Sequence, residues 1–397
     1  MNKFKKGENL TIRLTGLLFF LYPLSSLIVK ITSLNIIEPI VLILIFIGFR
    51  YNLIGRFIYY NKNIFALIFF FLIITIFSTI LFNSSFKNIQ FGIRLLVYFF
   101  VFCSIAGSAF KVKDILGFLR NFLLVFSIIC FLSLLDYFKI LQIPFFNETS
   151  LVFDDTSLAE VSDLPSIYGN RNQFAVFLLL GFVISYQFLI EKIGNLYINI
   201  LSIFLISICL FLSFSRGAIL SCLLFLIIKN INSFNFSTII FFTIVLFFIS
   251  KLEFLFPAYE ILSTRFSSLS EGSLTQGDKW RYVSFYETLN ELPTHPIGLG
   301  WGNFESKLLT GVRNSHNTFV TILRAGGFVG VCILLLTVVI NKLKIITLFG
   351  NKNIIYLKNI VIILIFYSVT HDILGTLILY VSLGIIFSFR IKNKQIK

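Results

Sequence analysis

The chain has 397 residues, of which 57% are hydrophobic and 13% are charged. An ordinary soluble domain is about one-quarter charged, so a fold of this composition has too few polar side chains to cover its surface in water, which excludes a cytosolic enzyme. The formal net charge is +15. The lysines and arginines nevertheless fall in short clusters between apolar runs, a pattern typical of membrane topology and not of a nucleic-acid-binding surface.

Twelve apolar runs are suited to membrane-spanning helices, since a bilayer core takes about 20 residues. The predicted spans are 14–34, 37–55, 64–82, 89–110, 115–138, 169–190, 196–213, 217–229 with its flanks, 236–252, 317–341, 354–371 and 373–390. The first follows a basic cluster but has no small-residue cleavage site, so we expect an uncleaved helix and not a signal peptide. The predicted fold is an all-α, polytopic integral membrane protein, with residues 1–397 forming a single membrane domain.

Basic residues divide the connections between these spans into two sets. One set carries Lys or Arg throughout, near residues 3–13, 50–62, 111–113, 192, 229, 342–352 and 390–397. In the other set, the connection near Ser84 has Lys87 alone. Because short cytoplasmic loops retain Lys and Arg, we expect the first set and both termini in the cytoplasm.

Two long connections, 139–168 and 253–315, fall on the outer side, the second between spans 9 and 10. The second contains apolar residues at helical spacing, namely Trp280, Val283, Tyr286, Leu289 and Leu292. This spacing predicts a short amphipathic helix on the membrane surface. Two prolines then end the helix, and three alternate glycines predict a tight turn. These residues are Pro293, Pro296, Gly298, Gly300 and Gly302.

All cysteines lie within predicted spans: Cys103, Cys130, Cys209, Cys222 and Cys332. An odd number of thiols in helix packing argues against a disulfide framework, so we expect small apolar packing residues. Their spacing suits no metal site, and no cluster of outer carboxylates suited to Mg²⁺ is apparent. We therefore expect neither a metal nor another cofactor.

Ionisable residues at the rim of a membrane bundle are costly, so each is a functional candidate. Arg216 stands alone at the outer face between spans 7 and 8. It either snorkels to the interface or binds a ligand. Asn170, Arg171 and Asn172 open span 6. Asn172 is suited to cap that helix, and the cluster also suits an anion or sugar hydroxyls.

Arg313, His316 and Asn317 precede span 10. A helix N-terminus disfavours positive charge, so His316 should stay neutral near pH 7 and accept a proton as a general base. The alternative is that His316 only caps the helix. Asp372 follows His371 at the outer end of span 11, where it can orient an imidazole, accept a sugar hydroxyl, or mark the end of the span.

Loop alternation places four separated residues on the same side of the membrane: Arg216, Arg281, His316 and Asp372. Between about residues 170 and 330 the motifs are Ser215-Arg216-Gly217, Trp280-Arg281, the turn from Pro296 to Phe304, Ser315-His316-Asn317-Thr318-Phe319, and Gly326-Gly327. In order and spacing they resemble the bacterial O-antigen polymerase and ligase superfamily of integral-membrane glycosyltransferases, which includes Wzy-type polymerases and lipid A-core ligases.

The resemblance implies a helical bundle of the polyprenyl-linked glycosyltransferase type (GT-C-like) in the bacterial inner membrane, with its active site facing the periplasm. It implies an enzyme that moves a glycan from undecaprenyl diphosphate to an acceptor hydroxyl without a metal ion, and of the two family activities we expect a polymerase, because such enzymes are diverse and commonly of this size. By the same resemblance, Arg216 and Arg281 bind the diphosphate, His316 is the base and Asp372 is the membrane-edge acid. Arg265 lies in the same large loop, and either it or Arg281 can be the essential arginine.

Partners implied in this way are the undecaprenyl-diphosphate-linked glycan, the membrane lipid and a chain-length regulator, with no nucleic acid. Two alternatives stay open. One is a ligase that moves polymer to lipid A-core. The other is a lipid-linked glycan flippase or transporter, which twelve spans would suit, although no internal repeat is apparent.

Overall fold

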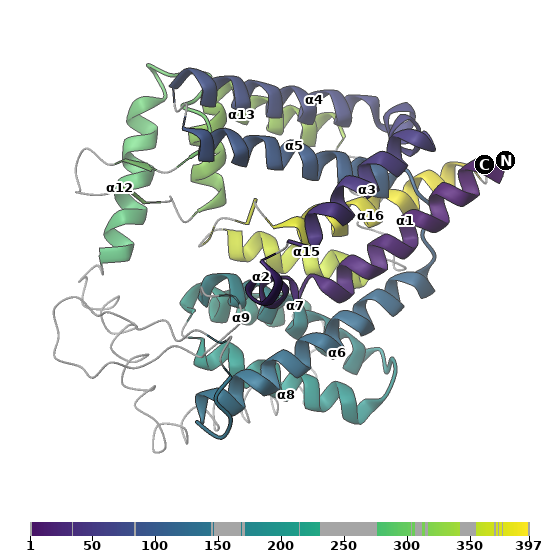
Figure 1. Cartoon of the computed structure of the whole chain (residues 1–397). Helices are drawn as coiled ribbons and strands as arrows, with labels where there is room; N and C mark the ends of the chain where they lie inside the picture. The colour runs from purple at the N-terminus through teal and green to yellow at the C-terminus, as the bar shows by residue number, and fades with distance from the viewer. Residues whose placement is uncertain are drawn as a thin grey trace. The chain divides into compact units, whose positions relative to one another are not determined.

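The structure is a computed structural model of the chain (Figure 1). It describes residues 2–33, 35–82, 85–143, 146, 168, 171–213, 215–230, 276–302, 304–305, 312–313, 317–341, 355–368, 371, 373–374 and 376–395. These residues are almost entirely helical. The described part of the chain contains only one pair of strands, β1 (Phe304–Glu305) and β2 (Val312–Arg313), which are antiparallel.

The helices follow the predicted spans closely. They are α1 (Asn2–Leu21), α2 (Ser25–Thr32), α3 (Ile37–Arg50), α4 (Leu53–Phe82), α5 (Phe86–Ala106), α6 (Val112–Tyr137), α7 (Arg171–Ile190), α8 (Leu196–Leu212), α9 (Arg216–Asn230), α12 (Gln276–Glu291), α13 (Thr318–Ile340), α15 (Ile355–Ser368) and α16 (Leu377–Gln395). Each predicted span coincides with a helix, except that 14–34 covers two helices and 236–252 lies outside the described residues. The predicted all-α character is confirmed.

Within the described ranges, five helices are long and apolar enough to cross a membrane individually: α4, α5, α6, residues 173–190 of α7, and α13. The pair of α1 and α2 makes a sixth candidate if it counts as one span. Four shorter apolar helices lie in α8, α9, α15 and α16. The helices are those of a polytopic membrane protein, whereas the count of twelve spans stays a prediction.

The first predicted span, 14–34, is not one continuous helix. It bends by 76° between α1 and α2, at a turn that contains the buried Pro23. Proline has no backbone N–H and its ring collides with the carbonyl four residues earlier, so a helix breaks there. The apolar composition of the run concealed this single breaking residue.

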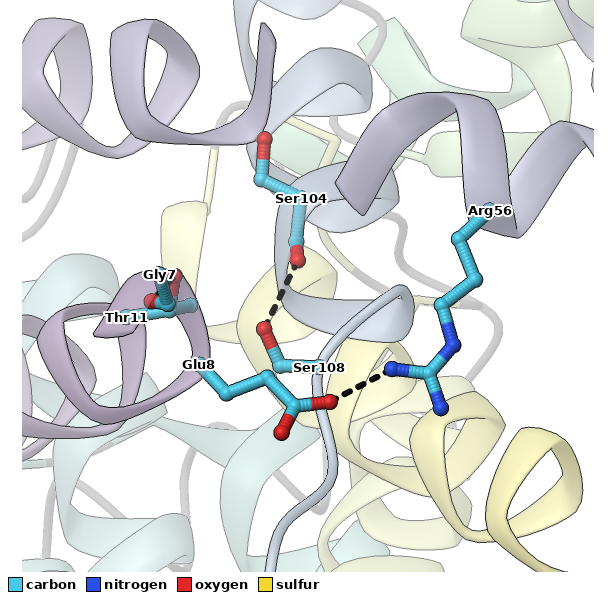
Figure 2. Close-up of polar contacts among 6 residues, drawn as sticks. All are labelled: Gly7, Glu8, Thr11, Arg56, Ser104 and Ser108. Carbon is cyan, nitrogen blue, oxygen red and sulfur yellow. Dashed lines mark hydrogen bonds and ion pairs between the residues drawn. The ribbon is translucent and has the colours of Figure 1, made fainter. Parts of the chain in front are cut away.

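Helix α4 begins earlier than predicted, because the expected connection between spans 2 and 3 is itself helical. The 30-residue helix is kinked at Asn61, where φ is −137° and ψ is 35°. Its first turns carry Arg56, which forms an ion pair with Glu8 of α1 (Figure 2). Beside this pair, the Ser108 hydroxyl donates to the Ser104 carbonyl at the end of α5 (Figure 2).

The chain divides into two compact units, residues 1–122 with 280–397 and residues 123–279. In the first unit, aromatic side chains of α4 and α5 form the core, with Phe57, Phe71, Phe99 and Phe102 buried in one cluster that also includes Trp301 and residues of α13. In the second unit, α7 packs on α8. All the cysteines are free thiols, four of them buried, as the expected packing role requires.

Candidate active site

The turn after α12 is fixed to the end of α4. The Ser78 hydroxyl donates to the carbonyl oxygens of Ile297 and Gly298, each at 2.9 Å. The Thr79 hydroxyl oxygen accepts from the Trp301 backbone N–H at 2.8 Å. Since Trp301 is 1% exposed, this turn is anchored by both its backbone and its largest side chain.

The same turn interlocks with a kink in α13. Gly298 has φ +80° and Gly327 has φ +57°, both in the left-handed region that favours glycine. The Leu299 N–H donates to the Arg324 carbonyl at 2.8 Å, and the Val329 N–H donates to the Pro296 carbonyl at 3.1 Å. The predicted tight turn is confirmed, and its partner is the pair of glycines in α13.

Glycine is required for lack of space as well as for conformation at this joint, the contact between the turn at Gly298 and the kink of α13 at Gly327. A Cβ on Gly298 would lie 2.5 Å from the Arg324 carbonyl oxygen, and a Cβ on Gly327 would lie 2.3 Å from the Pro296 carbonyl oxygen. Real Cβ atoms do not approach backbone oxygens so closely. The joint therefore sets the position of α12 relative to α13, and with it the segments that precede and follow the turn.

Helix α12 confirms the short helix predicted from the spacing of Trp280 to Leu292. Its polar side faces inward. Ser284, Glu287 and Thr288 are buried, whereas Tyr282 and Phe285 are 65% and 46% exposed. A helix on a soluble protein has the reverse arrangement. The outward aromatic face is that of an interfacial helix, and its location on the membrane surface stays a prediction.

The start of α13 is capped by Asn317. Its side-chain oxygen accepts from the backbone N–H groups of Phe319 at 2.8 Å and Val320 at 3.2 Å. Asn317 is therefore a cap of α13, and whether His316 also contributes to capping stays untested. His316 itself lies outside the described residues.

Thr318 connects the start of α13 to the segment after α15. Its hydroxyl donates to the His371 carbonyl and accepts from the Ile373 N–H, both at 3.0 Å. Asp372 lies between these two partners and outside the described residues. The structure thus brings together two segments that are far apart in sequence, each of which carries a predicted site residue.

Residues 201–335 match a family model described as O-antigen ligase. The match confirms the resemblance to the O-antigen polymerase and ligase superfamily. Members of this family are membrane glycosyltransferase-type enzymes, either polymerases or ligases. No curated protein and no solved structure matches the chain.

The matched O-antigen ligase segment contains most of the predicted site. Arg216 is the first residue of α9, Arg281 lies in α12, and Arg313 pairs through its backbone with Phe304 in the β1–β2 ribbon. The side chains of these three arginines lie outside the described residues, as does all of Arg265. Their predicted contacts with a substrate stay predictions.

The cluster that opens span 6 lies outside the O-antigen ligase match. Helix α7 begins at Arg171, so Asn172 lies in its first turn and not at the predicted N-cap. Asn170 lies outside the described residues, and so do the side chains of Arg171 and Asn172. Arg216 and this cluster belong to the second compact unit, and Arg281 and Asn317 belong to the first.

Sequence reasoning missed a polar cluster beneath α12. Glu291 and Glu287 attract the charge of the Arg324 guanidinium, and His295 lies beside them. The hollow among these groups measures about 10 Å³, room for about one water molecule. It is too small for a substrate, so the cluster holds α12 against α13. The sequence signal for this cluster was Arg324, an ionisable residue inside predicted span 317–341.

Within the described ranges, no three His, Cys, Asp or Glu side chains come together in a way that could hold a metal ion.

Proposed function

We propose that the protein is a surface-polysaccharide polymerase that moves a glycan from undecaprenyl diphosphate to the acceptor hydroxyl of another lipid-linked repeat unit. The observation that carries this proposal is the family match over residues 201–335, which spans the motifs around Arg216, Arg281 and His316. The hydrogen bonds of Thr318 support it further, because they join the segments that contain His316 and Asp372.

The residue roles follow from the chemistry of the leaving group. A diphosphate gains negative charge as the glycosidic bond breaks, and fixed guanidinium groups in a water-poor site stabilise that charge. Arg216 and Arg281 supply this charge, with Arg265 and Arg313 as further diphosphate ligands. Arg216 opens α9, where the helix dipole disfavours a cation, so an anionic ligand explains its place better than helix stability does.

His316 removes the proton of the acceptor hydroxyl as that oxygen attacks the anomeric carbon. The C–O bond to the diphosphate breaks on the opposite face, so the reaction inverts the anomeric centre and proceeds with cationic side chains in place of a metal ion. Asp372 orients His316 or accepts a sugar hydroxyl, and Asn170, Arg171, Asn172 and Asn317 line the path of the glycan.

The proposed setting is the bacterial inner membrane, with about twelve spans in a GT-C-like bundle. Both termini are cytoplasmic and the site faces the periplasm. Figure 1 supports this orientation within the first compact unit, because the start of α1 and the end of α16 point to one end and α12 lies toward the other. A chain-length regulator is a proposed partner.

A ligase is the second candidate, because the matching family model is described as O-antigen ligase. The surface polysaccharide of a deletion strain separates the two activities. Single unpolymerised repeat units support the polymerase, whereas intact polymer stranded on the lipid carrier identifies a ligase. Transfer by the purified protein without any ion gradient separates either enzyme from a flippase.

A further inference from the structure

A second polar site lies in the first compact unit, outside the segment that matches the family model. A cavity of about 430 Å³ opens among the α1–α2 bend, the start of α3 and the outer half of α5. Its polar lining includes Tyr22, Asn35, Glu38, Gln90, Arg94 and Tyr98. Small-molecule sites in proteins commonly measure roughly 300–1,000 Å³, so this cavity has the size of a ligand site.

Two polar residues of this cavity, Asn35 and Glu38, are connected by hydrogen bonds. The Asn35 side-chain amide donates to the Glu38 carboxylate at 2.8 Å, and its oxygen accepts from the Ile37 N–H at 3.3 Å. The charges of Arg94 and Glu38 both act on the Tyr98 hydroxyl. A carboxylate, a guanidinium and a phenol from two helices therefore gather around one space.

The membrane setting argues that this space is not filled by lipid. Arg94 lies eight residues after the start of α5, about 12 Å along the helix at 1.5 Å per residue. An arginine that faces hydrocarbon near mid-depth costs about 2.5–3.5 kcal/mol. Arg94, Glu38 and Gln90 are exposed and line one open hollow, so the low-cost partner for Arg94 there is water or a polar ligand and not lipid.

Contacts connect this cavity to the segment that carries Asp372. The Tyr22 hydroxyl accepts hydrogen bonds from the backbone N–H groups of Leu377 and Ile378, the first residues of α16. The Tyr98 ring packs on Tyr380, with centroids 5.6 Å apart. Helix α16 begins at Leu377, four residues after Ile373, which is hydrogen-bonded to Thr318. The cavity therefore borders the same end of α16 as the proposed site.

We infer that this cavity binds sugar residues of the acceptor glycan, an inference that rests on the proposed glycosyl transfer. Glu38 accepts from sugar hydroxyls, Arg94 donates to them, and Gln90 does both. The tyrosine rings offer apolar faces on which a sugar ring packs. The cavity pairs one acid with one base, so it suits a hydroxyl-rich neutral ligand better than a diphosphate, which needs an excess of cations.

The test uses Arg94→Gln and Gln90→Ala in the purified full-length protein, with Lys87→Gln as the matched control. Lys87 is exposed on the same helix and does not line the cavity. The donor is the lipid-linked single repeat that accumulates in the deletion strain, and the varied acceptor is the same repeat freed from its diphosphate, which can accept a glycan but cannot donate one. Both cavity variants should raise the KM for the acceptor at least tenfold and leave the KM for the donor within twofold of wild type, and the control should change neither. Unchanged acceptor KM, or equal loss for both substrates, overturns the inference.

A binding measurement separates this inference from the proposed function. The probe is the repeat oligosaccharide released from the host's own surface polysaccharide, measured by equilibrium dialysis. His316→Ala should bind this probe as wild type does while lacking transfer, and Arg94→Gln should bind it at least tenfold more weakly. Wild-type protein that transfers glycan but does not bind the probe contradicts the cavity assignment alone. Protein that binds the probe at this cavity without transferring glycan contradicts the proposed function alone.

Discussion

At the scale of single residues, the family motifs divide into structural and chemical members. The glycines of the turn and of α13 allow two backbones to approach, as the bonds between Leu299 and Arg324 and between Val329 and Pro296 show. Asn317 caps α13. The chemistry is proposed for the charged members, Arg216, Arg281 and His316, whose side chains lie outside the described residues.

Gly298→Ala should destabilise the protein by at least about 1–2 kcal/mol from its left-handed backbone alone, and by more because the new Cβ meets backbone atoms of α13. Thermal unfolding in detergent measures the loss. The matched control is Gly194→Ala, which has φ +74° and nothing within 4 Å of the new Cβ. Equal losses in the two variants would show that the joint is not tightly packed.

Arg281→Lys should lower transfer at least tenfold with normal protein accumulation, because a lysine ammonium cannot form the two parallel hydrogen bonds of an arginine to a diphosphate. Initial rates of the purified variant measure this loss. Arg265→Lys, made in parallel, decides which large-loop arginine is essential. Full activity of Arg281→Lys would leave Arg281 as a surface residue of α12.

At the scale of elements, apolar runs predicted the helices because membrane-spanning length and composition are strong signals. They did not predict the break at Pro23, which a single residue decides, or the early start of α4, where the expected connection is itself helical. The inward polar face of α12 was also missed. Spacing identifies the stripes of a helix, but it does not say whether protein or lipid covers each stripe.

The ion pair between Glu8 and Arg56 connects α1 to α4 with side chains that are 18% and 11% exposed. Arg56→Ala should destabilise the protein by up to about 3 kcal/mol, because it leaves a mostly buried carboxylate without its partner. The charge swap Glu8→Arg with Arg56→Glu should recover part of the loss. Thermal unfolding of the single and double variants tests this, and additive losses would mean that the pair contributes no coupling.

At the scale of the whole molecule, charge alternation predicts the topology, and the described helices support a polytopic membrane protein. The sequence could not predict how separated segments meet. The contacts of Thr318 with His371 and Ile373 span more than 50 residues, and no local pattern encodes them. The cavity beside Arg94 was missed for the same reason, because its walls come from segments that look merely hydrophobic.

Reporter fusions test the topology. Fusions after Lys352 and after Lys397 should show cytoplasmic activity, and fusions within 139–168 and 253–275 should show periplasmic activity, because the basic connections stay inside. A periplasmic signal at Lys352 would contradict the even number of spans. It would also contradict the prediction that the proposed site residues all lie on the outer side of the membrane.

The most direct test of the central claim is glycan transfer by purified His316→Ala, with Lys87→Gln, at an exposed position of α5, as the control. Wild type and the control should extend lipid-linked repeat units. His316→Ala should be at least about 100-fold slower, the contribution typical of a general base. Transfer by His316→Ala within a few-fold of the wild-type rate would contradict the assignment.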